Sequence, residues 1–397
     1  DIISPVTSDI RPSNTRFNEL YPIASVSFDE YLDTATIHSA IEINKGTYIV
    51  PGITKYYEVF DRSVINFFPT QRLDKSFNYI LKIDGEISDT VGNSLGADLT
   101  RTFPTTDLDI DTEISVDKME NLTFNEISGG AGSWWAPAAS GSTTGIVAEE
   151  TSLEIETDIV NILTESTQSL RVNYGWRSSD DEHLIRQYRG SVSTPKFDGS
   201  KTLQTYVFGD GNGNQFRFVV RDGSGELEAS EWYTVDWLGW KLVSWDMSED
   251  DIIPWVNGNG TINGNAYLDS FQLTYVEGQP STGFIIFDDL SAVTFGLATS
   301  NEEELATDIP STIELNQNYP NPFNPTTTIS YSIGESGPVS IAVYNVMGQK
   351  VAELLNTTKT AGTYQVNWNA TGQASGIYYY RLQTPGQVIT RQMTLIK

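Results

Sequence analysis

Short stretches in which apolar and polar residues alternate recur along the whole chain. Clear examples are Ile23–Phe28, Ala40–Ile43 and Tyr79–Ile83, and clusters of Gly, Asn, Asp and Pro separate such stretches. An alternation with period two places every second side chain on one face, as in a β-strand with one buried side. We therefore predict an all-β chain built from consecutive β-sandwiches.

Polar and acidic stretches divide this pattern into three units. We predict domains at residues 1–106, 121–296 and 314–397. The acidic residues 107–120 bury little, and we interpret them as a linker or an exposed connecting strand. Residues 297–313 contain consecutive glutamates and a proline, so we interpret them as a second linker.

Composition narrows the classes of function. The chain has 397 residues, with 52 Asp and Glu, 24 Lys and Arg, no Cys and two His. Disulfide frameworks, thiolate zinc sites and cysteine nucleophiles are excluded, and a histidine-built metal centre has too few ligands. The net charge of -28 repels nucleic acids and anionic membranes and favours calcium and neutral ligands such as polysaccharides. No run of about 18 apolar residues occurs, so we expect no membrane-spanning segment.

The charge is distributed unevenly between the units. Residues 1–314 carry 19 basic and 50 acidic side chains, a balance of -31. Residues 315–397 carry 5 basic and 2 acidic side chains, a balance of +3. The terminal unit therefore presents a different kind of surface from the rest of the chain.

The terminal unit has motifs of a known type. Its characteristic segments are Asn318–Tyr331, Val339–Gln349, Ala361–Trp368, Ser375–Leu382 and Gln392–Lys397. In spacing and order they resemble the C-terminal sorting domain of type IX secretion cargo, which is similar to a small Ig-like domain of flagellar hook-capping proteins. The resemblance implies the type IX secretion machinery as a partner and an extracellular or outer cell-surface location. An ordinary Ig-like spacer is the alternative.

The first unit resembles the bacterial Ig-like domains of the S-layer type. The segments that carry this resemblance are Pro22–Glu30, Leu32–Ile37, Phe68–Leu73, Ile87–Leu95 and Arg101–Thr105. Such modules usually hold a catalytic or binding head away from an anchor. The resemblance therefore implies a spacer role for residues 1–106.

The central unit resembles the non-catalytic jelly-roll carbohydrate-binding modules found behind some bacterial glycoside hydrolases. The matching segments are Leu122–Glu126, Gln168–Tyr174, Val207–Arg217, Val219–Gly225, Val235–Val243 and Ile285–Leu290. The resemblance implies a polysaccharide or cell-surface glycan as ligand. It also implies a structural calcium ion between the first and last strands, with Glu126 and Asp288 as ligands and Asp289 nearby.

Eight of the nine tryptophans lie between Trp134 and Trp255, and they form either core or platforms on which sugar rings stack. We assign Trp237, Trp240 and Trp245 to the fold, with one of the first two on each side of a bend at Gly239. The others lie in or beside Gly-, Ser- or Pro-rich stretches that we expect at the surface. The predicted glycan-binding residues are Trp134, Trp135, Trp176, Arg186, Tyr188, Trp232 and Trp255, with Arg189 close by; edge packing is the alternative for each.

Signatures of catalysis are missing from the sequence. It contains no Gly-x-Ser-x-Gly motif, no phosphate-binding loop with a lysine and no His-Glu-x-x-His. We therefore predict a non-catalytic, secreted or cell-surface glycan-binding protein, or the accessory region of a larger glycan-active enzyme. The alternatives are a structural or adhesion protein that self-assembles through its Ig-like sandwiches, and a glycosidase or lyase, because two carboxylates suffice for glycoside hydrolysis.

Overall fold

The computed structural model of the chain describes residues 3–12, 20–38, 40–125, 134–190, 195–297, 314–318, 321–333, 337–346, 349–359, 362–384 and 387–396. It confirms the all-β prediction: within these ranges the only helices are the single 3-10 turns η1 (Thr34–Thr36), η2 (Pro137–Ala139), η3 (Ala148–Glu150) and η4 (Ile162–Thr164). No helix in this part of the chain is long and apolar enough to cross a membrane. The chain forms two compact units, residues 1–298 and 299–397.

The Ig-like domain is a sandwich of two four-stranded antiparallel sheets. The first has the order β1 (Thr7–Arg11), β2 (Ala24–Phe28), β6 (Arg62–Pro69), β5 (Gly52–Val59); the second has the order β4 (Tyr48–Ile49), β3 (Ile41–Lys45), β7 (Asn78–Ile83), β8 (Leu99–Pro104). Alternate side chains such as Val26, Ile43, Leu81 and Phe103 fill the space between the sheets. All five residues of β2 are buried, which shows that this sheet is covered on both faces.

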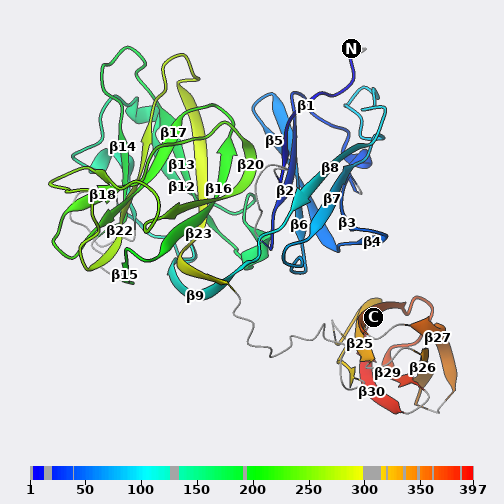
Figure 1. The fold of residues 1–397 in the computed structure, drawn as a ribbon. Coiled ribbons are helices and arrows are strands. Elements are labelled where there is room, and N and C mark those ends of the chain that lie inside the picture. The colour runs from blue at the N-terminus through cyan, green and yellow to red at the C-terminus, as the bar shows by residue number, and fades with distance from the viewer. Residues whose placement is uncertain are drawn as a thin grey trace. The chain divides into compact units, whose positions relative to one another are not determined.

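The central sandwich also has two sheets (Figure 1). The first sheet has the order β12 (Ser152–Glu156), β13 (Ser169–Gly175), β23 (Thr282–Leu297), β16 (Thr202–Asp210), β20 (Leu238–Asp246). The second has the order β14 (Ile185–Tyr188), β22 (Asn265–Thr274), β17 (Gln215–Arg221), β18 (Leu227–Ala229), β21 (Ile253–Pro254), with β15 (Phe197–Asp198) on β22 and β19 (Tyr233–Thr234) on β17. A short parallel pair, β10 (Phe124–Asn125) and β11 (Trp134–Trp135), lies beside them.

The acidic stretch before the central sandwich is a strand. Residues Leu108–Asp117 form β9, which pairs antiparallel with the second half of β23 from Leu290 to Leu297. Most of its side chains are exposed, because Asp, Thr and Glu alternate with isolated isoleucines. Of the two interpretations of residues 107–120, the exposed connecting strand is therefore the correct one.

The Ig-like domain packs directly on the first sheet of the central sandwich. Val64, Phe68 and Ile23 from the Ig-like domain form one buried cluster with Phe208, Trp240, Phe284 and neighbouring residues of the central sandwich. Arg62 donates from Nη2 to the carbonyl oxygen of Asp210 (2.6 Å), and Arg11 donates from Nη1 to that of Trp240 (2.8 Å). The first two predicted domains therefore share one compact unit.

Gly239 lies at the joint, that is, the contact between the Ig-like domain and the central sandwich, and its conformation there requires a glycine. Its φ of 89° lies in the left-handed region that favours glycine, and a Cβ there would lie 2.8 Å from Cγ2 of Val64 in the Ig-like domain. The bend sends Trp237 into the core of the sandwich and Trp240 into the joint with the Ig-like domain. The prediction that these two tryptophans pack on opposite sides of Gly239 is confirmed.

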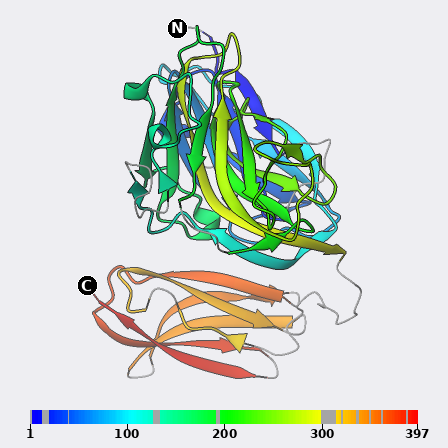
Figure 2. The ribbon, with the colours of Figure 1, turned by 90° about the vertical axis from the view of Figure 1, so that its left-hand side faces the viewer.

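The terminal unit is a smaller sandwich (Figure 2). One sheet has the order β24 (Glu314–Leu315), β25 (Thr326–Ile333), β28 (Gly362–Asn369), and the other has the order β27 (Lys350–Lys359), β26 (Gly337–Asn345), β29 (Gly376–Gln383), β30 (Val388–Leu395). Alternating Ile, Tyr, Val and Leu side chains fill the core, as the sequence pattern predicts. The predicted linker 297–313 lies outside the described residues except for Leu297.

Candidate functional site

The two sheets of the central sandwich differ in what their outward faces contact. The first sheet packs against the Ig-like domain, whereas the second sheet, with β14, β22, β17 and β18, lies on the far side of the sandwich from that domain (Figure 1). Register places Arg186, Gln272 and Arg217 side by side on three adjacent strands of the second sheet. Residues paired in this way share one face of a sheet, so the two arginines lie on the same outward surface.

Arg186 is the centre of an ionic group on this surface. Its Nη2 lies 2.7 Å from Oδ2 and 2.9 Å from Oδ1 of Asp269, and Nη2 of Arg221 lies 3.1 Å from the same Oδ1. The Asp269 side chain is fully buried, in β22 next to a bulge that interrupts its pairing with β17. The carboxylate therefore fixes both guanidinium groups in place.

Aromatic rings surround this ionic group. The Arg186 guanidinium lies 4.8 Å from the ring centroid of Tyr188 and 5.0 Å from that of Trp255, and Trp135 meets Tyr188 edge to face with centroids 5.0 Å apart. The three rings are half-buried, so each retains solvent-facing surface. We call Trp135, Arg186, Tyr188, Arg221, Trp255 and Asp269 the aromatic–arginine cluster.

Trp232 lies beside the cluster and contacts a third arginine, Arg217. The Arg217 guanidinium lies 4.4 Å from its ring centroid and donates from Nε to Oε1 of Gln272 (2.8 Å). Burial lowers the pKa of Arg217 to about 10, which still leaves it charged at neutral pH. Arg189, in contrast, is turned away: it is 6 % exposed and pairs with Asp117 of β9 at 3.1 Å.

Two of the predicted glycan platforms are buried, so the expectation that they lie at the surface is wrong. Trp134 is 0 % exposed and stacks on Phe271, and Trp176 is 3 % exposed and contacts Tyr174 and His183. Their Gly- and Ser-rich surroundings suggested loops. Even the two-residue strand β11 alternates, however, and points Trp134 into the core and Trp135 outward. Trp237, Trp240 and Trp245, assigned to the fold, are all buried, as predicted.

Only one of the two predicted calcium ligands lies in the described part of the chain. Glu126 lies outside the described residues. Asp288 is fully buried; its Oδ2 accepts from the backbone N–H of Asn161 and its Oδ1 from the Ser166 hydroxyl, both at 3.0 Å. Burial raises the pKa of Asp288 to about 7, and no described Lys or Arg forms an ion pair with it. A buried carboxylate of this kind fits a cation, because a positive charge would offset the loss of hydration.

Asp269 and Arg221 were missed by the sequence reasoning. A signal was present: Asp269 interrupts the strand Ala-Tyr-Leu-Asp-Ser-Phe-Gln-Leu, and an acidic residue in such a strand requires a charged partner when it is buried. The partner itself is not evident from sequence, because Arg186 lies 83 residues away along the chain.

Comparisons with known proteins identify both ends of the chain. Residues 1–105 match the family model of a bacterial Ig-like domain, and residues 317–397 match that of a secretion system C-terminal sorting domain. No curated protein matches the chain. These two matches confirm the sequence interpretation of the first and last units. They leave the carbohydrate-binding resemblance of the central unit as a prediction.

Similar solved structures are distant. The chain is similar to native alpha-2-macroglobulin from Escherichia coli (10 % identity, TM-score 0.22, covering 98 % of this chain and 96 % of that chain). It is also similar to the surface layer protein SbsC (10 % identity, TM-score 0.23, covering 99 % and 54 %) and to PorU from Porphyromonas gingivalis (10 % identity, TM-score 0.18, covering 98 % and 33 %). The sorting domain indicates export to the cell surface or the extracellular space through interaction with the type IX secretion machinery.

Proposed function

We propose that the exported protein binds a polysaccharide or a cell-surface glycan through the outward face of the second sheet of the central sandwich. The observation that supports this function is the aromatic–arginine cluster, in which half-buried aromatic rings and fixed arginines lie together on and beside the outward face of the second sheet. Trp135, Tyr188 and Trp255 are each half-buried and keep surface for a ligand, although Trp255 also packs against Val219, Leu227 and Ala229.

The cluster offers the two kinds of contact that a sugar ring uses. The ring edges and outer faces of Trp135, Tyr188 and Trp255 can stack on the apolar face of a pyranose. Arg186 and Arg221 carry N–H groups that their bonds to Asp269 do not all occupy, since each guanidinium has five. Because Asp269 holds both arginines in position, little side-chain entropy remains to be lost when a ligand binds.

We also propose that the protein acts without catalysis. The cluster contains one carboxylate, Asp269, which is buried and saturated by two arginines. It is therefore unsuited to the role of a general acid or nucleophile, which needs a carboxyl group free to exchange protons or attack. Incubation with a panel of polysaccharides should release no new reducing ends. Their appearance at a rate that depends on protein concentration would show an enzyme instead.

Self-assembly is the second candidate function, and one observation favours it. The edge strand β4 of the Ig-like domain exposes both Tyr48 (49 %) and Ile49 (52 %), and an exposed apolar edge can pair with another strand. Light scattering that shows concentration-dependent polymers, lost in Ile49→Lys, would support assembly. A single monomeric species at all concentrations would exclude it.

Affinity electrophoresis in polysaccharide gels tests glycan binding with the full chain. Trp255→Ala and Tyr188→Ala should abolish retardation while the protein stays folded, because both rings are half-buried and their truncation should cost about 0.5–3 kcal/mol. Tyr31→Ala, at an exposed tyrosine of the Ig-like domain outside β4, is the matched control and should be retarded like the wild type. Loss of retardation together with a large fall in melting temperature would show that these rings serve the fold.

A further inference from the structure

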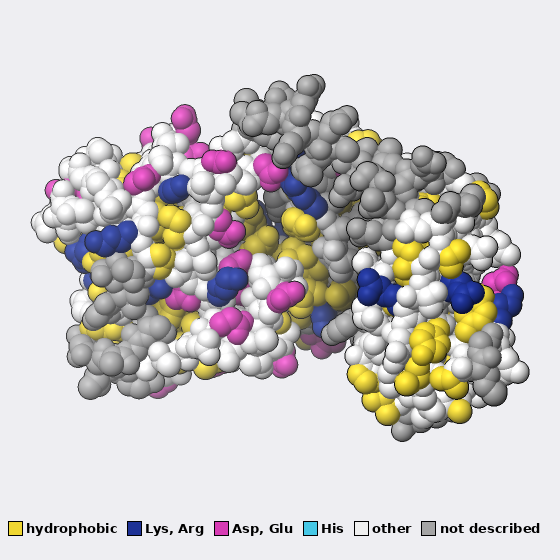
Figure 3. Space-filling view, turned by 90° about the horizontal axis from the view of Figure 1, so that it is seen from below, with side chains coloured by type: hydrophobic (Ala, Val, Ile, Leu, Met, Phe, Trp, Pro, Cys, Tyr) yellow, Lys and Arg dark blue, Asp and Glu magenta, His cyan; other side chains and the backbone are white. Residues whose placement is uncertain are grey.

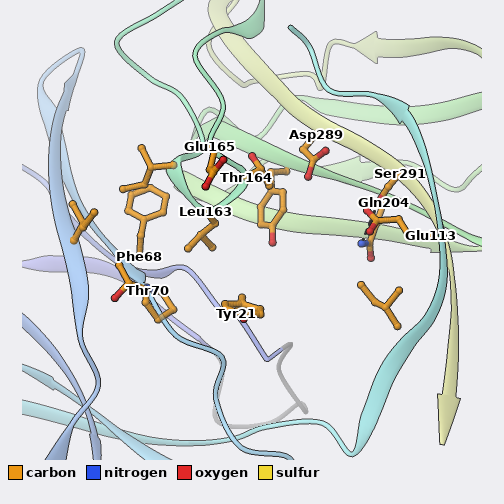
Figure 4. Close-up of a pocket in the computed structure, with 15 residues that line it drawn as sticks. Tyr21, Phe68, Thr70, Glu113, Leu163, Thr164, Glu165, Gln204, Asp289 and Ser291 are labelled. Atoms are coloured by element: carbon orange, nitrogen blue, oxygen red, sulfur yellow. Dashed lines mark hydrogen bonds between the residues drawn. The ribbon is translucent and has the colours of Figure 1, made fainter. Parts of the chain in front are cut away.

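A pocket of about 530 Å³ opens between the Ig-like domain and the central sandwich. In Figure 4, Tyr21 and Phe68 of the Ig-like domain face Asp289, Gln204 and Glu113 of the central sandwich, and Leu163, Thr164 and Glu165 close a third side. We call it the joint pocket. It lies against the first sheet, so it is separate from the aromatic–arginine cluster on the second.

The wall formed by the central sandwich contains a buried hydrogen-bond acceptor without a donor. Gln204 is 7 % exposed, and its Nε2 donates to Oγ of Ser291 at 3.4 Å, while its Oε1 has no partner. A buried acceptor left unpaired is unfavourable because it has lost its hydrogen bonds to water. A ligand that brings an N–H or O–H group to this oxygen would restore one of them.

The charged side chains described in the lining have one sign. They are the carboxylates of Glu113, Glu165 and Asp289, and none of the described lining residues is Lys, Arg or His. Asp289 reaches this position because it lies in a bulge of β23 with a φ of 44°. A left-handed conformation is uncommon for a residue other than glycine. The pocket therefore attracts cations and repels anions.

The remaining walls are apolar and partly solvent-exposed. Tyr21, Ile53 and Ile110 are 43 %, 47 % and 45 % exposed, and all three line the pocket. Apolar side chains of this size gathered in a concave site bind organic groups, since a small hydrated metal ion gains nothing from them. No group of three or more His, Asp or Glu side chains with metal-binding geometry occurs among the described residues.

We propose that the joint pocket binds an organic ammonium ion, that is, a protonated amine carried on a ring or a short alkyl body. The carboxylates of Glu113, Glu165 and Asp289 attract the positive charge into the pocket, and the ammonium group donates one of its three N–H groups to Oε1 of Gln204. The body of the ligand packs on Tyr21 and on the isoleucines of the walls. A positive charge next to an aromatic ring adds a cation–π attraction.

Titration of the full chain with two pairs of probes, followed by NMR or calorimetry, tests this assignment. The first pair is 2-phenylethylammonium and neutral 2-phenylethanol, and the second is glucosamine and N-acetylglucosamine. Each ammonium probe should bind about tenfold more tightly than its neutral counterpart, as expected for one charge-assisted contact. The ammonium probe with the higher affinity shows whether an aromatic amine or an amino sugar fits the pocket better.

Variants locate the binding. Glu113→Gln combined with Glu165→Gln should weaken the ammonium probes about tenfold, whereas Glu277→Gln, an exposed acidic residue outside the lining, should leave them unchanged. Both glutamates are exposed, so the fold is expected to tolerate the changes. Equal affinity for charged and neutral probes, an unchanged affinity in the double variant, or no binding by either ammonium probe would each overturn the proposal. Because Trp255→Ala leaves this pocket intact, failure here is distinguishable from failure of glycan binding.

Discussion

Asp269 is the buried carboxylate at the centre of the candidate site. Its carboxylate has no solvent contact, and two arginines compensate its charge. Trp135, Tyr188 and Trp255 depend on it indirectly, because it holds Arg186 between two of them. The position of the proposed glycan-binding surface is thus set by a residue whose side chain is buried from solvent.

We expect Asp269→Asn to destabilise the first compact unit by about 1.5–3 kcal/mol, the range for hydrogen bonds to a charged group. An amide has one acceptor oxygen and no charge, so Arg186 loses its bonds to Oδ2 and neither arginine keeps a charged partner. Urea denaturation measures the change, with Asp107→Asn as a control at an exposed position. An unchanged denaturation midpoint would show that the ion pairs contribute nothing to stability.

Asp210 gives the unit a specific dependence on pH. Burial raises its pKa to about 6, although Tyr174 donates to its Oδ2 at 2.5 Å and the N–H of Phe284 donates to the same oxygen at 3.0 Å. The folded protein therefore holds a proton that the unfolded chain, with a pKa of 3.8, releases. The contribution of this group to stability is present at low pH and is lost as the pH rises through about 6.

Asp210→Asn cannot titrate, and the difference between the two proteins isolates the effect. The free energy of unfolding of the wild type, relative to Asp210→Asn, should fall by up to about 3 kcal/mol between about pH 4 and pH 7. The other carboxylates are common to both proteins and cancel. A relative stability that stays flat or rises over this range would contradict the raised pKa.

At the scale of elements, the joint between the Ig-like domain and the central sandwich is the main structural finding. Strand β20 presents Trp240 to the Ig-like domain, and β6 presents Val64 and Phe68 to the sandwich. The residues of the joint form a hydrophobic cluster separate from the cores of the two domains. They are buried as completely as the residues of those cores. Binding experiments should therefore use the whole unit, because an isolated central sandwich would expose Trp240 and Phe208.

Trp240→Ala tests the joint. We expect a loss of about 3–5 kcal/mol, the usual range when a buried Trp or Phe is truncated to alanine. Because the cluster belongs to both domains, the single unfolding transition of the unit should separate into two in calorimetry. Lys55→Ala, at an exposed position on β5, should leave one transition at the wild-type temperature. A wild type that already unfolds in two steps would contradict the single unit.

The bulged segment of β23 carries the predicted calcium site. If Asp288 binds calcium, a chelator should lower the melting temperature of the wild type, since the ion ties this strand to the start of the domain. Asp288→Asn should abolish the response to the chelator. Equal melting temperatures with chelator and with added calcium would show that no calcium contributes to the fold.

Strands were predictable from this sequence, and their partners were not. The alternation in Ala24–Phe28 predicts a strand, and the same holds for Gly376–Gln383 in the sorting domain. Leu108–Asp117 left a choice, because its exposed face is as polar as a linker. The joint was not predictable from the sequence. The pattern around Phe208 and Trp240 indicates that they are buried, but it does not indicate that the Ig-like domain buries them. Trp134 and Trp135 were not separable until the direction of β11 was known.

At the scale of the whole molecule, the sorting domain differs in net charge from the rest of the chain. The acidic residues of the first 314 positions are interspersed with Lys and Arg over the face of the central sandwich seen in Figure 3, where no large patch of one sign forms. The sorting domain, with a balance of +3, shows few acidic side chains in the same view. With this distribution, the proposed ligand binding would depend on local clusters of side chains and would need no attraction by net charge.

A glycan array probed with the full chain tests the central claim most directly. We predict binding to at least one class of polysaccharide by the wild type and by Tyr31→Ala, and its loss in Trp255→Ala and Tyr188→Ala with folding preserved. Binding that is identical in all four proteins would place the glycan site elsewhere. No binding of the folded wild type to any glycan would contradict the proposed function.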